Sequence, residues 1–418
     1  MRILWIVNMM FPKLASHLGL KTSTSGTWLI DLAEGLSNLD NVEIGIMTYG
    51  QQKDFVDVKI ENIRYFVFPG GGKRLLFGNK NTRKDCQKIL EQFKPDLIHI
   101  HGTEYAPGYE IIKTGTKVPV LLTIQGMLGR IKDEYYGGLS FRELLKCTTL
   151  KELLRFKTPF TSKMIFNNSA KRERKVLNSV KYVTGRTDWD KVTMLNINSN
   201  LKYYRLNYNL PAPFYNAKKW DINEVQRRSI YLSSSHYSLK GLHVFVDALE
   251  IVKSKYPDVK VYMPGGRAKD GKIRASSGYM KFVLKKIKEK GLEENFYFIG
   301  GIPSNKVVEE LQRANVCVVC SAMEGASATI REASMIGTPS ICSYRGGMTE
   351  LITDGVTGFT YDYPEYSMLA LKIMQIFEDD ELAISFSEKS IEISEKRHDR
   401  EKNVLETFKV YEDICANN

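Results

Sequence analysis

Short apolar runs alternate with segments of helical periodicity along the whole chain. In the first half, apolar runs bounded by turn residues predict buried strands at residues 3–9, 42–49, 63–69, 97–102, 118–126 and 180–186, with helices at 27–39 and 82–93. A second series predicts strands at residues 229–235, 259–266, 296–301, 316–322 and 339–344, with helices at 241–256, 279–292 and 306–314. This alternation is typical of parallel sheets covered by helices, so the pattern predicts an α/β protein.

The two series predict two doubly wound, Rossmann-like domains. A chain of 418 residues is long enough for two domains that each bury a core. We expect an N-terminal domain over 1–210, a linker over 211–226, a C-terminal domain over 227–395 and a helix over 396–418 that crosses back to the first domain. Ligands of such domains bind at the carboxyl ends of the strands, so we expect the domains to face each other across a cleft.

Several familiar catalytic motifs do not occur in the sequence. The first predicted strand is not followed by GxGxxG, and there is no Walker A sequence, zinc-ligand cluster or GxSxG elbow. Cys317 and Cys320 form a CxxC, but they lie inside an apolar run without a second pair, so we interpret them as buried strand residues. The six scattered cysteines are not a disulfide framework and favour a reducing cytoplasm. We expect no cofactor and no metal.

The densest chemical signal lies at residues 316–359, which read as strand, loop, helix and strand. Glu324 lies in the loop, and Glu332 lies eight positions later in a short helix that ends at Gly337. Carboxylates accept hydrogen bonds from vicinal hydroxyls, so Glu332 suits a ribose and Glu324 a sugar ring. The free N–H groups at a helix start suit a diphosphate, and here they belong to Gly325, Ala326, Ser327 and Ala328.

With these motifs the chain resembles the family-4 (group 1) retaining glycosyltransferases of GT-B fold, whose hallmark is Glu-x7-Glu in this setting. The similarity continues through IGTPSICSYRGG and ELITDGVTGF, and upstream through SSSHYSLKGLHVFVDALEIV and YFIGGIPSNKVVEELQRANVCV. The segments IQG, GRTDWDK and PFYNAKKW also resemble bacterial surface-polysaccharide transferases.

The resemblance implies retaining transfer of a sugar from a nucleotide diphosphate donor, with a UDP-sugar favoured, to a saccharide hydroxyl. The acceptor it implies is a lipid-linked glycan of capsule, O-antigen or exopolysaccharide synthesis. Glu332 would hold the ribose, Glu324 the sugar hydroxyls and Lys240 the diphosphate. Where relatives carry a Gly-Arg pair before that lysine, this chain has Ser234 and Ser235, which removes one phosphate cation.

Polar residues at predicted strand ends of the first domain complete the candidate site. Gln125 stands where many relatives have a sugar-contacting histidine, and the alternative is that it caps a turn. We expect at most one of His99 and His101 to point into the cleft, and we favour His101. Arg186 and Asp188 follow the last strand of this domain, where an ion pair that fixes a loop explains them equally well. The remaining candidates are Thr103 and Glu104 on the acceptor side, and Ser25 and Gly26 near the phosphates.

Charge is divided unevenly along the sequence. Residues 1–220 contain 34 Lys and Arg against 19 Asp and Glu, whereas residues 221–418 contain 26 against 29. Residues 139–160 place apolar side chains beside Arg142, Lys146, Lys151, Arg155 and Lys157, a composition that suits an anionic membrane surface. We therefore expect a cytoplasmic protein that is peripheral at the inner face of the membrane, although a solvated helical face explains the same composition.

Two other functions fit parts of the sequence. Nucleotide-sugar epimerases also have two Rossmann-like domains, but they lack the Glu-x7-Glu setting. A non-catalytic protein that binds nucleic acid or another anionic polymer would explain the basic half, yet no recognised binding fold or RNA-reading motif is present, so we expect no nucleic-acid partner.

Overall fold

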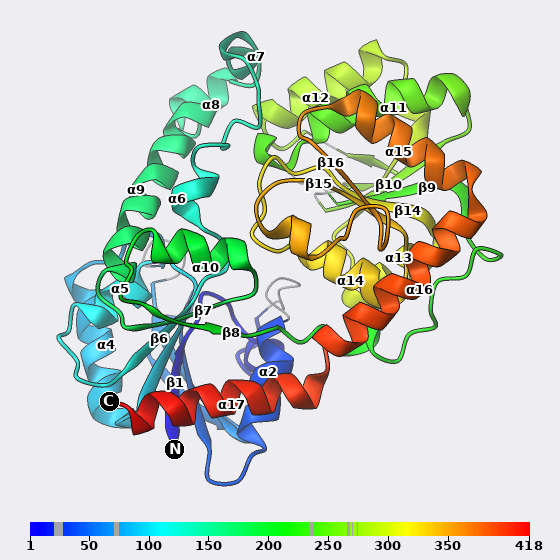
Figure 1. Ribbon diagram of the computed structural model, residues 1–418. Helices are drawn as coiled ribbons and strands as arrows, with labels where there is room; N and C mark the ends of the chain where they lie inside the picture. The colour runs from blue at the N-terminus through cyan, green and yellow to red at the C-terminus, as the bar shows by residue number, and fades with distance from the viewer. Residues whose placement is uncertain (21–27, 71–74, 234–236, 266–267, 270, 274) are drawn as a thin grey trace. The chain divides into compact units, whose positions relative to one another are not determined.

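The computed structural model of the protein divides into two units and describes every residue except 21–27, 71–74, 234–236, 266–267, 270 and 274 (Figure 1). The first unit consists of Met1–Gly129, Phe166–Pro211 and His398–Asn418. The second unit consists of Arg130–Ile165 and Ala212–Arg397.

The first unit is built on an eight-stranded sheet with the strand order β3-β4-β2-β1-β5-β6-β7-β8. Neighbouring strands are parallel except for the hairpin formed by β3 and β4. Both edge strands were missed by the sequence reading because they are half-exposed and carry no apolar run. The strands are β1 (Arg2–Ile6), β2 (Glu43–Gly50), β3 (Val56–Ile60), β4 (Ile63–Pro69), β5 (Leu97–His101), β6 (Val120–Thr123), β7 (Tyr182–Gly185) and β8 (Lys202–Arg205).

Helices bury both faces of this sheet, which is why its central strands are apolar throughout. Along β1, Ile3 and Trp5 point into one core and Leu4 and Ile6 into the other, as the two-residue repeat of a strand requires. The helices that end in this unit are α1 (Pro12–His17), α2 (Trp28–Ser37), α4 (Lys80–Phe93), α5 (Pro107–Ile112), α9 (Pro159–Leu177), α10 (Asp188–Leu195) and α17 (Arg400–Ala416).

The C-terminal helix α17 packs on the first unit. Its Tyr411 is fully buried in the core that contains Trp5, and the Trp5 indole N–H donates to the Tyr411 hydroxyl at 3.1 Å. The preceding helix α16 (Asp380–Arg397) belongs to the second unit. The chain therefore returns to its starting unit between Arg397 and His398, close to the predicted start of the crossing segment at residue 396.

The second unit contains a six-stranded parallel sheet with the strand order β13-β10-β9-β14-β15-β16. Its strands are β9 (Gln226–Leu232), β10 (Lys260–Pro264), β13 (Phe296–Gly300), β14 (Ala314–Val319), β15 (Ser340–Ser343) and β16 (Phe359–Tyr361). The helices around it are α11 (Leu242–Lys255), α12 (Gly278–Glu289), α13 (Ser304–Arg313), α14 (Ala328–Ile336), α15 (Tyr366–Glu378) and α16. The fold class is thus confirmed as two doubly wound α/β units.

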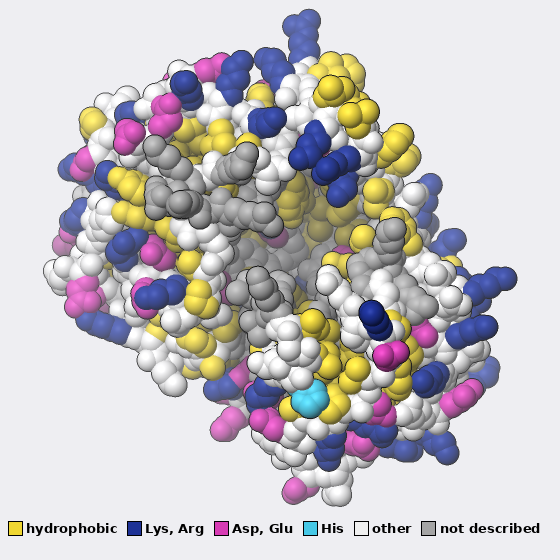
Figure 2. Space-filling view, turned by 180° about the vertical axis from the view of Figure 1, so that it is seen from behind, with side chains coloured by type: hydrophobic (Ala, Val, Ile, Leu, Met, Phe, Trp, Pro, Cys, Tyr) yellow, Lys and Arg dark blue, Asp and Glu magenta, His cyan; other side chains and the backbone are white. Residues whose placement is uncertain are grey.

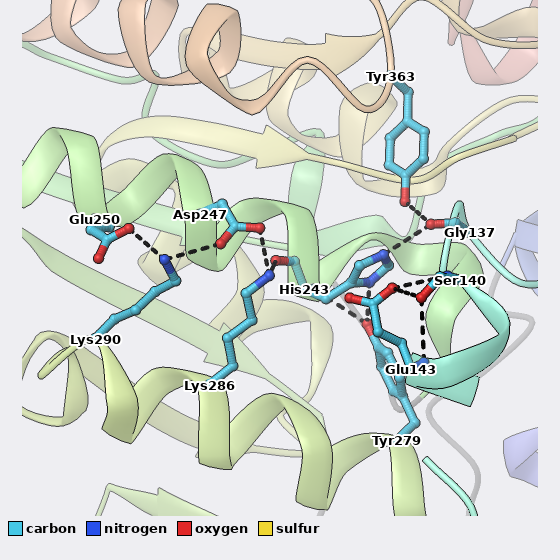
Figure 3. Close-up of polar contacts among 10 residues, drawn as sticks. All are labelled: Gly137, Ser140, Glu143, His243, Asp247, Glu250, Tyr279, Lys286, Lys290 and Tyr363. Carbon is cyan, nitrogen blue, oxygen red and sulfur yellow. Dashed lines mark hydrogen bonds and ion pairs between the residues drawn. The ribbon is translucent and has the colours of Figure 1, made fainter. Parts of the chain in front are cut away.

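Residues 130–165 differ from the predicted boundaries, because they pack with the second unit although they precede its first strand. The Gly137 carbonyl accepts hydrogen bonds from His243 Nε2 at 2.9 Å and from the Tyr363 hydroxyl at 2.6 Å (Figure 3). Glu152 accepts a hydrogen bond from the Gly278 amide at the start of α12, at 2.8 Å. The helices of this segment are α6 (Leu128–Ile131), α7 (Phe141–Lys146) and α8 (Leu150–Leu154).

This placement changes the interpretation of the charge. Within residues 130–165, Lys and Arg outnumber Asp and Glu by four. With that segment counted where it packs, the formal net charges are +7 for the first unit and +5 for the second. The basic charge is therefore shared between the two units, and the first unit remains slightly the more basic.

Candidate functional site

The end of β14 and the loop after β9 bring Lys240 and Glu324 together in the second unit. Lys240 ends the short 3-10 helix η2 (Ser238–Lys240), and its Nζ forms an ion pair with Glu324 Oε1. The Ser321 hydroxyl donates to the same carboxylate oxygen at 2.8 Å. Burial lowers the pKa of Lys240, but the charge of Glu324 outweighs this effect and raises it above its ordinary value. Lys240 is therefore a permanent cation at neutral pH.

Two glycines allow the loops around this ion pair to approach one another. Gly241 has a φ of +69°, and a Cβ placed there would lie 1.8 Å from the Cys320 carbonyl oxygen. Gly346 also has a φ of +69°, and its Cβ would lie 2.1 Å from the Glu324 carbonyl oxygen. The next amide, Gly347 N–H, donates to that carbonyl at 3.0 Å. The backbone of Glu324 is thus fixed by a contact that only glycine permits.

Replacement of Gly346 by Ala is expected to displace the Glu324 loop and to destabilise the second unit by about 2–4 kcal/mol, because strain and a backbone clash combine. Thermal unfolding measures the loss. Gly355 is the matched control, since it has a φ of +73° but open space around its Cβ position. If Gly346→Ala costs no more than Gly355→Ala, the close approach at Glu324 is not important for stability.

Helix α14 presents the predicted anion site and carries Glu332. Its N-cap residue, Ser327, forms no side-chain capping hydrogen bond, so the Ser327 hydroxyl does not occupy the first-turn amides. The Thr329 and Ser233 hydroxyls are 2.7 Å apart and join the start of α14 to the end of β9. Burial raises the pKa of the Glu332 carboxyl to about 7, although the neighbouring Arg331 opposes this shift. Gly325, Ala326 and Ala328 lie in the same loop and first turn.

Four of the predicted donor-side residues lie outside the residues that the structure describes. They are Ser25 and Gly26 in the first unit, and Ser234 and Ser235 after β9.

The predicted acceptor side lies at the carboxyl ends of β5, β6 and β7 in the first unit. We expected at most one of His99 and His101 to point into the cleft, but the two side chains share one face of the sheet, because residues two apart in a strand do so. Their rings lie 3.8 Å apart between centroids, and both side chains are buried. His99 contacts the Tyr411 hydroxyl at 2.7 Å, whereas burial lowers the pKa of His101 to about 3. Both histidines are therefore neutral core residues.

Glu104, Gln125 and Arg186 do come together at this edge of the sheet. The Arg186 guanidinium donates to the carbonyls of Ile124 and Gln125, at 2.8 and 3.0 Å. Gln125 Nε2 in turn donates to the His101 carbonyl at 3.4 Å, so it caps that turn as the alternative interpretation proposed. Burial raises the pKa of Glu104 to about 7, with a further contribution from Glu173. A carboxyl whose pKa lies near 7, beside an amide and a guanidinium, is suited to binding sugar hydroxyls.

Thr103 and Asp188 have structural partners instead. The Thr103 hydroxyl donates to Glu173 at 2.7 Å, and the same buried carboxylate accepts from the Leu128 and Gly129 amides. Asp188 is exposed at the start of α10 and pairs with Arg205 at 3.3 Å. The Arg186 loop is held by Asp190, which is fully buried and accepts from the Arg186 amide at 3.0 Å.

Sequence reasoning missed Ser321, Glu173 and Asp190. Ser321 stands three residues before Glu324, a spacing that brings both side chains to one loop. The sequence does not indicate that Glu173 is buried, because this residue lies in a run of charged residues on α9 that is typical of a solvent-exposed helix face. Asp190 lies only four positions after Arg186, a spacing short enough to have suggested the pairing.

Comparison with known proteins finds relatives among the glycosyltransferases. Residues 215–393 match the family model described as glycosyl transferases group 1. An uncharacterized glycosyltransferase of Methanocaldococcus jannaschii is 22% identical over 91% of this chain and 92% of its own length. A D-inositol 3-phosphate glycosyltransferase of Corynebacterium urealyticum is 28% identical over 36% of this chain and 35% of its own length.

Solved structures of low sequence identity share the whole fold. A sucrose-phosphate synthase from Thermosynechococcus elongatus has a TM-score of 0.75 at 16% identity and covers 100% of both chains. Anabaena HepE in complex with UDP-glucose has a TM-score of 0.65 at 16% identity, with 98% of this chain and 100% of its own chain covered. The family match covers Lys240, Glu324 and Glu332 together. The chain is therefore a glycosyltransferase of GT-B fold, and residues 215–393 of its second unit match the group 1 glycosyltransferases.

Proposed function

We propose that this enzyme is a family-4 transferase that moves a hexose-type sugar from a nucleotide diphosphate donor, with UDP favoured, to a saccharide hydroxyl and retains the anomeric configuration. The observation that carries the proposal is the ion pair of Lys240 and Glu324 in the same unit as α14, whose start offers free amides and whose second turn carries Glu332. The complex of Anabaena HepE with UDP-glucose supports UDP as the nucleotide.

Each side chain has a distinct part in this proposal. Lys240 and the first amides of α14 neutralise the charge that develops on the diphosphate as its bond to the sugar carbon breaks. Glu332 accepts hydrogen bonds from the ribose hydroxyls, which contributes equally to the ground and transition states. Glu324 accepts from the sugar hydroxyls and exchanges its contact with Lys240 for them when the donor binds. Glu104, Gln125 and Arg186 of the first unit orient the acceptor.

A panel of nucleotide sugars tests the donor directly. Slow transfer of the sugar to water releases UDP, GDP or ADP, which a coupled assay detects without knowledge of the acceptor. The released sugar shows by proton NMR whether its configuration is retained. Release of UDP from one hexose donor, with the α-anomer formed first from an α-linked donor, supports the proposal. Release of no nucleotide from any donor, or of an inverted sugar, contradicts it.

Activity is expected to persist in EDTA, because the counter-charge for the diphosphate comes from Lys240 and helix amides. The measurement is donor hydrolysis before and after chelation, followed by addition of manganese. Loss of activity that manganese restores would show that the leaving group needs a metal ion.

The surface of residues 139–165 supports a lipid-linked acceptor at the inner face of the cytoplasmic membrane. Helices α7 and α8, the turn after α8 and the start of α9 expose eight large apolar side chains, namely Phe141, Leu145, Leu150, Leu153, Leu154, Phe156, Met164 and Ile165. Figure 2 shows hydrophobic side chains interleaved with lysines and arginines at the upper right. Exposed apolar side chains at this density mark an interaction surface, and the basic ones favour an anionic partner.

A basic pocket adjoins this surface. It measures about 980 Å³ and is lined by Lys151, Arg155, Lys157 and Lys281, with Glu152 as the acidic residue in its lining. Glu152 is already engaged by the Gly278 amide and the Thr149 hydroxyl. The cations therefore outnumber the acid at a place where phospholipid head groups would meet apolar side chains. Among the described residues, no helix is both long and apolar enough to cross a membrane.

The protein is expected to sediment with anionic vesicles at low salt and to be released at high salt, since electrostatic attraction decays over about 10 Å at 0.1 M. Leu154→Ser with Phe156→Ser should abolish sedimentation. Leu371→Ser is the matched control, because Leu371 is an exposed leucine on α15 of the same unit. Equal binding to neutral and anionic vesicles, or equal effects of the two sets of substitutions, would contradict membrane binding by this surface.

A further inference from the structure

A second basic pocket lies in the first unit, between the start of α4, the end of α5 and the middle of α9. It has a volume of about 530 Å³, within the size range of pockets that bind small molecules. Six cationic side chains line it, namely Lys80, Arg83, Lys113, Lys171, Arg172 and Lys175. Glu110 is the acidic residue in that lining.

Internal ion pairs neutralise only part of this charge. Glu110 binds Arg83 at 3.0 Å and Lys113 at 2.9 Å, so its two oxygens are both engaged. No acidic side chain that the structure describes forms an ion pair with Lys80, Lys171 or Lys175. These three lysines approach one pocket from two helices, and their mutual repulsion is relieved when an anion enters it.

Arg172 connects this pocket to the candidate acceptor loop. Its guanidinium donates to the carbonyl oxygens of Leu76 and Glu104, at 2.8 and 2.5 Å. The side chain is half-buried, and burial lowers the pKa of its guanidinium although Glu104 and Glu110 oppose that shift. A ligand in the pocket is thus one side chain away from the backbone of Glu104, which is a proposed acceptor-orienting residue.

We propose that this pocket binds an oxyanion on the saccharide acceptor, so that the enzyme selects an acidic or phosphorylated glycan over a neutral one. The inference rests on the proposed function because it specifies the acceptor of that reaction. Phosphate and carboxylate share the recognising chemistry, which is charge-assisted hydrogen bonding to several lysines and an arginine. The size of the pocket suits one or two sugar residues that carry such a group.

Ligand-observed NMR titration of the full chain tests the pocket with three probes, namely glucose 6-phosphate, galacturonic acid and neutral galactose. We expect the anionic sugars to bind at least tenfold more tightly than galactose. Lys171→Gln with Lys175→Gln should remove that preference. Lys84→Gln and Arg174→Gln are matched controls, since they lie exposed on α4 and α9 but not in the pocket lining. A preference for the phosphate identifies a phosphorylated acceptor, and a preference for the carboxylate identifies a uronic acid.

Equal binding of all three probes, or equal losses in the pocket and control variants, would overturn the proposal. Donor hydrolysis separates this failure from failure of the proposed function. One result would separate the two failures: the Lys171→Gln, Lys175→Gln double variant and the unmodified enzyme hydrolyse the donor equally, and neither binds an anionic sugar preferentially. The transferase function then stands and the pocket assignment is wrong.

Discussion

Replacement of Lys240 by Met is expected to slow sugar transfer by about 10²- to 10³-fold, the usual loss when one stabilising group is removed from a developing anion. The Ser234 and Ser235 positions provide no arginine to compensate. Because the nucleotide diphosphate is already charged in the ground state, its affinity should fall less than the rate. The measurement is the turnover number together with the dissociation constant of the nucleotide, each obtained on the same preparation.

Two controls isolate the effect on chemistry. Lys255→Met breaks a lysine–glutamate pair at the surface of the same unit, where Lys255 contacts Glu378 at 2.6 Å. The second control is the double variant Lys240→Met, Glu324→Gln, which leaves no carboxylate without its ion-pair partner. Its thermal unfolding temperature therefore shows whether loss of the lysine by itself impairs folding. Turnover of Lys240→Met equal to that of Lys255→Met would remove Lys240 from the mechanism.

Replacement of Glu332 by Ala is expected to weaken nucleotide binding by about 10- to 100-fold, since hydrogen bonds to a charged group contribute about 1.5–3 kcal/mol.

Nucleotide binding by the unmodified enzyme should also depend on pH. The pKa of Glu332 is raised to about 7 by burial, so the carboxylate that we propose as the ribose acceptor forms as pH rises through that value. Affinity should therefore increase about tenfold from pH 6 to pH 8.

Glu332→Gln separates this titration from that of the nucleotide phosphates. The variant keeps the shape of the side chain but does not ionise, so its affinity should follow only the phosphates. Calorimetric titration at several pH values measures both proteins. Identical pH profiles for the two would show that Glu332 does not contact the ribose. By contrast, Glu324→Gln should lower turnover more than nucleotide affinity if Glu324 contacts the sugar, as we propose.

The donor-side motif was predictable because it is local in the sequence. Glu324, Ser327 and Glu332 lie within one strand–loop–helix segment, so their spacing fixes which of them share an edge of the sheet. The pairing of Lys240 with Glu324 is less local, yet it follows from the parallel contact of β9 with β14, whose carboxyl ends adjoin. Resemblance supplied the roles, and backbone geometry supplied the reason for Gly241 and Gly346.

The acceptor side was predicted less well because its contacts are long-range. The sequence pattern does not reveal that His99 contacts Tyr411, a residue 312 positions later. It also does not show that Arg172 of α9 reaches the carbonyl of Glu104, or that Asp190 rather than Asp188 holds the Arg186 loop. These partners are selected by which helix packs on which face of the sheet.

By itself, the sequence determined two doubly wound units, their parallel strands and the position of the Glu-x7-Glu segment, because apolar periodicity and turn residues act over short distances. Only the tertiary structure decided where residues 130–165 belong. Their attachment depends on the Gly137 carbonyl meeting His243 and Tyr363, and on Glu152 meeting the start of α12. Such contacts join residues more than a hundred positions apart, and no local pattern encodes them. The same packing places the basic, apolar surface of residues 139–165 in the second unit, although these residues precede the first strand of that unit in the sequence.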